Sequence, residues 1–220
     1  WEEVAAGQAA QTAASKLLGY YVELWGERLC QMVHAGFHTP DWMQMSEGSG
    51  SPSEVRLVIF LVLEEVEALL AQSALILGEE QRQPIRVGER EFRRRGRGMI
   101  GHKGLRLDIE RLFSAEVCIY GGVTGWDCEA VAHSALKIAL KAMVEAARLH
   151  TFSKAAYHQV QVDCELLHQM LPYLASDCAP LDNLLEEVVV SVTDRCVEPT
   201  PLEPALVQGI VAKAQSKMRG

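Results

Sequence analysis

The sequence has no apolar run long enough to cross a membrane as a helix. Its longest apolar run, Leu57–Leu63, ends at Glu64 and Glu65, whereas a spanning helix needs about 20 apolar residues. The sequence also has no excess of positive charge, since 21 Lys and Arg face 29 Asp and Glu. Because phosphate contacts need a cationic surface, a general nucleic-acid-binding role is excluded.

Signature motifs of enzymes and disulfide scaffolds are missing as well. No serine lies in a G-x-S-x-G motif, and none of the six cysteines belongs to a C-x-x-C motif. The cysteines lie mostly among apolar neighbours, which is typical of reduced core residues in a cytosolic protein. The sequence therefore predicts no catalytic residues and does not predict an enzyme.

What the chain does have is the composition of a globular domain. Of its 220 residues, 49% are hydrophobic and 23% are charged, with a formal net charge of −8. It begins with Trp1 rather than Met, and without the basic and apolar regions of a signal peptide. We expect it to be a segment of a longer protein, with a core of its own.

Helical periodicity dominates the sequence. Apolar residues recur every three or four positions in seven stretches, and the stripe of the first stretch runs from Leu18 to Val33. These stretches predict helices over residues 3–37, 53–78, 105–113, 128–150, 153–175, 181–196 and from 201 onward. The predicted fold is all-α: an elongated helical bundle of about seven helices with little or no sheet. The helix over 128–150 should bury a face of mainly small residues: Val131, Ala135, Ile138, Ala142, Ala146 and Leu149.

Several residues mark where these helices begin and end. Ser53 and Asp127 are predicted N-caps, Thr151 or Ser153 is a third, and Gly78 suits the left-handed position after a helix. The best-defined start is the capping box Thr200-Pro201-Leu202-Glu203, with Pro201 as the first helical residue. Three tryptophans are expected to be core or interface anchors: Trp25, Trp42 and Trp126.

One stretch differs in charge from the rest. Between Arg82 and Arg111 ten basic residues face four acidic ones, a local charge of +6. We predict a mobile loop over 81–104, between an N-terminal helical part (1–80) and a C-terminal bundle (105–220), with one continuous rod as the alternative. Five basic side chains of this loop are candidates for binding an anionic membrane or an acidic partner: Arg93, Arg94, Arg95, Arg97 and Lys103. The alternative is a loop that is simply solvated.

Cofactor and metal motifs are weak. Gly96–Gly101 matches G-x-G-x-x-G, but the arginines before it are not the apolar strand that a dinucleotide site needs. His34 and His38 lie four apart without the Glu of a zinc-protease helix, and Cys164 with His168 supplies only two ligands on one face. We predict neither a metal nor a cofactor.

The order and spacing of short blocks resemble the C-terminal region of the vacuolar protein sorting fifty-one family. The most specific block is Gln159–Cys164, followed by Arg195–Pro199 and Pro201–Pro204. Weaker blocks fit in the same order, and the resemblance spans residues 18–211: Gln31-Met32, Asp41-Trp42, Val55-Arg56, Leu63–Glu65, Ile109–Ser114, Lys137–Lys141, Leu149–Lys154 and Leu184–Val189. The basic loop departs from the Ser-rich sequence of animal members, and the family's N-terminal coiled-coil region is absent from this sequence.

The resemblance implies a subunit of the Golgi-associated retrograde protein complex and of its relative, the endosome-associated recycling protein complex. Subunits of this kind are helical rods, similar to those of the exocyst and the conserved oligomeric Golgi complex. They tether vesicles for endosome-to-Golgi transport by binding other subunits and SNARE proteins, without catalysis, at the trans-Golgi network and recycling endosomes. The alternatives are an all-α scaffold or adaptor unrelated to vesicle traffic, or a cofactor-binding helical bundle.

Overall fold

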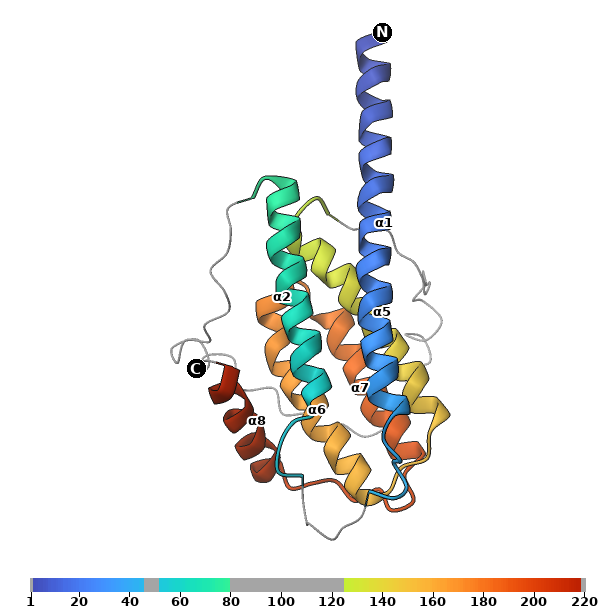
Figure 1. Ribbon diagram of the computed structural model, residues 1–220, viewed down its shortest axis with the longest axis vertical. Coiled ribbons are helices and arrows are strands. Elements are labelled where there is room, and N and C mark those ends of the chain that lie inside the picture. The colour runs from blue at the N-terminus through green and yellow to red at the C-terminus, as the bar shows by residue number, and fades with distance from the viewer. Residues whose placement is uncertain (1, 46–51, 80–124, 219–220) are drawn as a thin grey trace.

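The computed structural model describes residues 2–45, 52–79 and 125–218 of the chain. Six helices occupy these ranges, and consecutive ones run in opposite directions (Figure 1). Their bounds are α1 (Glu2–His38), α2 (Leu57–Leu77), α5 (Cys128–Leu149), α6 (Lys154–Leu174), α7 (Ala179–Asp194) and α8 (Pro204–Met218). This confirms the prediction of an all-α bundle, and the helix expected over 105–113 lies outside the described residues.

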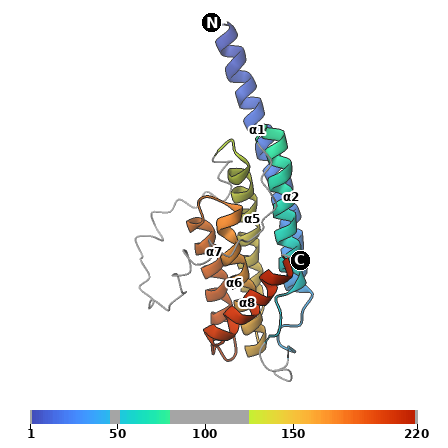
Figure 2. The ribbon, with the colours of Figure 1, turned by 90° about the vertical axis from the view of Figure 1, so that its left-hand side faces the viewer.

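The helices form two layers. α1 and α2 make one layer and α5, α6 and α7 the other, as the view in Figure 2 shows edge on. α5 is central because it contacts α1, α2, α6 and α7, while α8 packs on α6. The sequence explains the central position of α5: Ala132, Ala135, Ala139 and Ala146 are all fully or almost fully buried, and small side chains let neighbouring helices approach closely.

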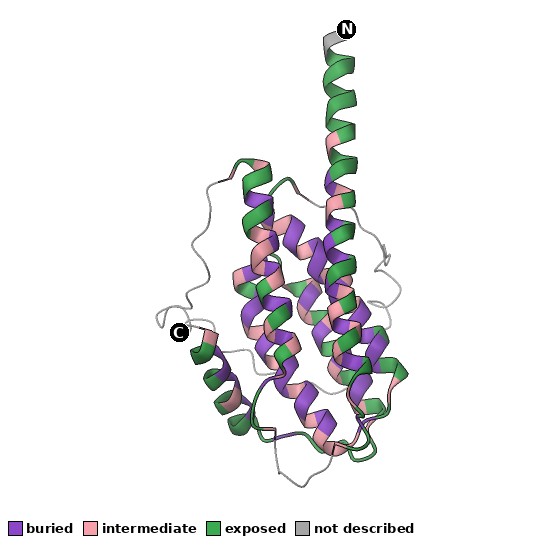
Figure 3. Cartoon of the chain, in the orientation of Figure 1, coloured by how far each residue is buried: buried purple, intermediate pink, exposed green. Residues whose placement is uncertain are grey.

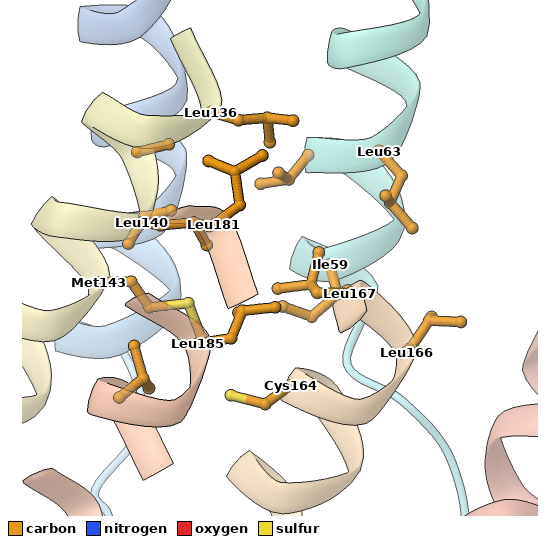
Figure 4. Close-up of a cluster of buried hydrophobic side chains, with 14 of the residues drawn as sticks. Ile59, Leu63, Leu136, Leu140, Met143, Cys164, Leu166, Leu167, Leu181 and Leu185 are labelled. Atoms are coloured by element: carbon orange, nitrogen blue, oxygen red, sulfur yellow. The ribbon is translucent and has the colours of Figure 1, made fainter. Parts of the chain in front are cut away.

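One hydrophobic core runs between the layers. Side chains from α2, α5, α6 and α7 meet in it, among them Ile59, Leu136, Leu167 and Leu181 (Figure 4). Figure 3 shows buried residues along the helices of both layers, whereas the N-terminal half of α1 is exposed. Helices on both sides of residues 80–124 thus share a single core. The predicted division into residues 1–80, 81–104 and 105–220 stays a prediction.

Most of the predicted helix ends are confirmed. The Asp127 side chain accepts from the Ala130 backbone N–H at 2.9 Å, and the Ser153 hydroxyl, rather than that of Thr151, accepts from Ala156. Gly78 has φ 71°, and the Glu79 N–H donates to the Ala74 carbonyl, which closes the end of α2. The predicted cap at Ser53 is wrong: Arg56 is the N-cap residue, and Val55 before it is buried.

The predicted start of the last helix is also wrong. α8 begins at Pro204, and the Glu203 carbonyl accepts the first helical N–H groups, from Leu206 and Val207. Tertiary contacts hold the preceding segment outside the helix, because the Leu202 N–H donates to the Gln161 side chain at 3.0 Å and Leu202 is buried. A proline does occupy the first helical position, as expected, but it is Pro204 rather than Pro201.

Two further details differ from the sequence-based expectation. Leu149, predicted on the small-residue face, is 71% exposed because it is the last residue of α5 and lies beyond the packed turns. Trp25 and Trp42 are buried as anchors, whereas Trp126 is half exposed and is no core residue of this chain.

Candidate interaction surface

The five basic residues proposed for membrane or partner binding lie outside the described residues. These are Arg93, Arg94, Arg95, Arg97 and Lys103. A candidate surface therefore has to be built from the helices. The most distinctive part of the described fold is α1, which is much longer than the bundle that it packs on (Figure 1).

The N-terminal half of α1 projects from the bundle. Its first buried residue is Leu18, and from there the buried positions follow the predicted stripe: Leu18, Val22, Trp25, Leu29, Val33 and Phe37. The turns before Leu18 extend about 24 Å beyond the core, given a rise of 1.5 Å per residue. A free helix in water is only marginally stable, so this arm is held as a helix mainly through its continuity with the packed half of α1.

A second, exposed stripe runs along another side of α1. Leu17, Tyr20 and Leu24 are 69%, 68% and 66% exposed. Ala6, Ala10 and Ala13 continue the stripe into the arm and are exposed too. The spacing alternates between four and three residues, which is the spacing of the apolar seam in a coiled coil. This seam can accept another helix.

The sequences of α1 and α2 are acidic, and three of their carboxylates are exposed: Glu23, Glu27 and Glu64. The two helices carry seven carboxylates and two cations, a net charge of −5. One cation, Arg28, pairs with Glu65 across the two helices and also lies over the Trp25 ring, with Cζ 5.4 Å from the centroid. Lys16 is the other cation, and it lies on the exposed side.

A buried polar network fixes the position of this layer on the bundle. Arg56, at the start of α2, donates from Nε to the Asp163 carboxylate in α6 and from its backbone N–H to Asp163 Oδ1, at 3.1 Å. Its Nη1 donates to the Gly36 carbonyl in α1 at 2.7 Å. The Gln159 amide donates to the Glu54 carbonyl and to Asp163. One network thus joins α1, α2 and α6.

Two aromatic rings enclose the guanidinium group of this network. Arg56 Cζ lies 4.7 Å from the Trp42 ring centroid and 5.2 Å from that of Phe37. The Asp163 side chain is fully buried. Burial raises the pKa of Asp163, and the charge and hydrogen bonds of Arg56 oppose that rise. This pairing is structural, because the aromatic rings and helices leave the carboxylate no access to solvent.

Sequence reasoning missed this network, although both partners lie in the blocks that carry the family resemblance. Asp163 falls in the same helical register as the buried residues Ala156, Val160 and Leu167. A carboxylate in an apolar register needs a buried cation, and this signal was present in the sequence. What the sequence lacks is any indication that the cation comes from Arg56, 107 positions away.

A histidine cluster lies where α1 ends. The rings of His34 and His38 stack at 5.6 Å, and His150 Nε2 lies 3.1 Å from His38 Nδ1. Burial, and the positive charge of His38 when protonated, lower the pKa of His150. The four-residue spacing in the sequence had already indicated that His34 and His38 are neighbours. The third histidine, His150, lies in the connection between α5 and α6.

The other histidine and cysteine candidates do not converge. His158 contacts the Thr200 carbonyl at 2.8 Å, His168 contacts Asp182 at 3.5 Å, and Cys164 is buried in the core. Among the residues that the structure describes, no three His, Cys, Asp or Glu side chains are placed to hold a metal ion. Of the five described cysteines, Cys128 and Cys164 are buried, and Cys30, Cys178 and Cys196 are half-buried.

Hydropathy gives one more result for the helices. Within residues 2–45, 52–79 and 125–218, no helix is both long enough and apolar enough to span a membrane.

Comparison with known proteins gives a consistent set of relatives. The chain is 32% identical over 216 residues to the human protein named vacuolar protein sorting-associated protein 51 homolog. It is 31% identical to the zebrafish (Danio rerio) protein of that name, over 216 residues, and 26% identical to the Arabidopsis thaliana one, over 232 residues. These matches cover 91%, 91% and 94% of this chain.

The relatives are much longer than this chain, which covers 27%, 26% and 28% of the human, zebrafish and Arabidopsis proteins, respectively. No protein-family model and no solved structure matches the chain. The homology nevertheless extends over nearly all of the chain and includes both animals and plants. Over about nine-tenths of its length, the chain is homologous to part of the proteins named vacuolar protein sorting-associated protein 51 homolog.

Proposed function

We propose that the protein is a subunit of a multisubunit vesicle-tethering complex in endosome-to-Golgi retrograde transport. The observation that carries this proposal is the 32% identity to the human vacuolar protein sorting-associated protein 51 homolog over 91% of the chain. The all-α bundle with its projecting helix supports it, because helical bundles offer long surfaces for partner helices. The protein acts by binding other tether subunits and SNARE proteins rather than by catalysis.

The same proposal covers the complexes and the place of action. The family resemblance points to the Golgi-associated retrograde protein complex and the endosome-associated recycling protein complex. The protein acts peripherally at the trans-Golgi network and recycling endosomes, and its helices form a rod of the kind found in the exocyst and conserved oligomeric Golgi subunits. The relatives' names, which refer to vacuolar protein sorting, agree with a role in transport between these compartments.

Affinity purification of the tagged protein from its own cells tests the proposal. We expect recovery of the other tethering subunits and a SNARE protein; recovery of none of them would refute it. Two arginine variants, one in the buried network and one at the surface, serve as a matched pair. Arg56→Met should lose these partners because it disrupts the buried network that positions α1 and α2. Arg148→Met, which removes an exposed pair with Glu187, should retain them.

The basic segment supports a second proposal from the sequence alone. Arg93, Arg94, Arg95, Arg97 and Lys103 bind an anionic membrane surface and assist tethering there. Co-sedimentation with vesicles of phosphatidylcholine and phosphatidylserine should weaken with added salt and with replacement of the four arginines by Ser. Binding that ignores both changes, or no binding, would contradict this role.

A further inference from the structure

We propose that the exposed seam of α1 pairs with the α1 seam of a second copy of this chain, in antiparallel orientation. The seam consists of Ala6, Ala10, Ala13, Leu17, Tyr20 and Leu24. This inference goes beyond the tethering function and uses only the described residues of α1. Its starting point is that three large apolar side chains at coiled-coil spacing are each about two-thirds exposed.

Antiparallel pairing places at least one large apolar side chain in each of the four central layers of the seam. If Leu17 faces Tyr20 of the second copy, the same register places Leu24 opposite Ala13, and two-fold symmetry repeats both contacts. The two innermost layers then pair Leu17 with Tyr20, and the two flanking layers pair Leu24 with Ala13. A symmetric parallel pair would instead place each residue opposite itself, Tyr20 against Tyr20 and Ala13 against Ala13, with uneven spacing between the helices.

Charges beside the seam favour the same register. Lys16 and Glu23 are exposed and flank the seam on one side. In the antiparallel register Lys16 of one copy lies beside Glu23 of the other, and symmetry makes this pair twice. In a parallel pair Lys16 would lie beside Tyr21 of the other copy, without a charge partner. Charge complementarity therefore selects a second copy in antiparallel orientation as the occupant.

The rest of α1 leaves room for this partner. Below the seam, Glu27, Gln31 and Ala35 continue the same side of the helix and are all exposed. The packed half of α1 contacts α2 and α5 through its buried stripe, which runs along another side of the helix, so the arm of the second copy can lie along its exposed side. Each projecting arm, unsupported in the single chain, gains a neighbouring helix along its whole length.

The mass of the purified chain over a concentration series tests the inference. Light scattering after size exclusion should show the 24.3 kDa monomer converting to twice that mass as concentration rises. Leu17→Glu with Leu24→Glu should abolish the dimer, whereas Leu75→Glu, at an equally exposed leucine of α2, should not. A monomer at every concentration, or a dimer insensitive to the seam variant, would overturn the proposal.

Charge exchange tests the orientation. Lys16→Glu and Glu23→Lys should each raise the dimer Kd by about tenfold, since each turns two attractive pairs into repulsive ones. The double variant should recover the original Kd, and an equimolar mixture of the two single variants should form a heterodimer. Failure of both rescues would refute antiparallel pairing. All variants are at exposed positions, and circular dichroism should confirm unchanged helicity. Because no other protein is involved, failure here leaves the tethering proposal intact.

Discussion

Replacing Arg56 by Met should strongly destabilise the fold. The substitution keeps an unbranched aliphatic side chain but removes the guanidinium group, whose Cζ lies over the Phe37 and Trp42 rings. Asp163 then stays fully buried with the Gln159 amide and one backbone N–H as its remaining donors. Leaving a buried charge without its partner costs about 3–5 kcal/mol of the free energy of unfolding.

The loss should be measurable as a change in thermal stability. For a chain of this size, 1 kcal/mol lowers Tm by about 2–4 °C, so Arg56→Met should lower Tm by roughly 6–20 °C. Urea unfolding followed by circular dichroism gives the free energy directly. The cost should shrink at acidic pH, where Asp163 can be protonated and no longer needs a counter-charge.

Two variants sharpen this prediction. Arg56→Met combined with Asp163→Leu removes both charges and should recover much of the lost stability, because an apolar pair avoids the desolvation penalty. Arg148→Met breaks an ion pair whose partners are 54% and 44% exposed, and it should cost at most about 1 kcal/mol. If Arg56→Met were as mild as Arg148→Met, the network would not be what fixes α1 and α2 on the bundle.

Three further predictions follow from burial, backbone conformation and pKa. Leu29→Ala, at a fully buried position, should lower the free energy of unfolding in urea by about 2–5 kcal/mol. Leu149→Ala, at a position that is 71% exposed, should lower it by less than about 0.5 kcal/mol. Equal losses would contradict the burial pattern. Gly78→Ala should cost about 1–2 kcal/mol because φ is 71° there, and an unchanged Tm would be inconsistent with a left-handed end of α2. Burial and His38 lower the pKa of His150 from its ordinary 6.5, so below that pH the unfolded chain binds more protons at this residue. This contribution to stability should therefore fall as pH drops through 6.5, and His150→Asn should flatten the decline.

Within the described residues, local patterns were enough to predict which stretches are helical. The stripe from Leu18 to Val33 gave the buried face of α1, and Asp127, Ser153 and Gly78 marked helix ends correctly. These features depend on residues within one or two turns of each other, which is why they can be read from the sequence.

Features that depend on distant residues could not be predicted. The start of α8 moved to Pro204 because Leu202 is held by Gln161 of another helix. The Arg56–Asp163 pair joins elements more than a hundred residues apart. The exposed seam of α1 was also missed, because periodicity alone marks apolar positions without saying which stripe the bundle covers.

Return of an endosomal cargo receptor to the trans-Golgi network, in cells depleted of the protein, tests the account most directly. We predict that depletion delays this return and that re-expression of the wild-type protein restores it. Arg148→Met should restore it as well, whereas Arg56→Met should not, because the α1–α2 layer is then no longer held in place on the bundle. Normal cargo return after complete depletion would contradict a role in endosome-to-Golgi tethering.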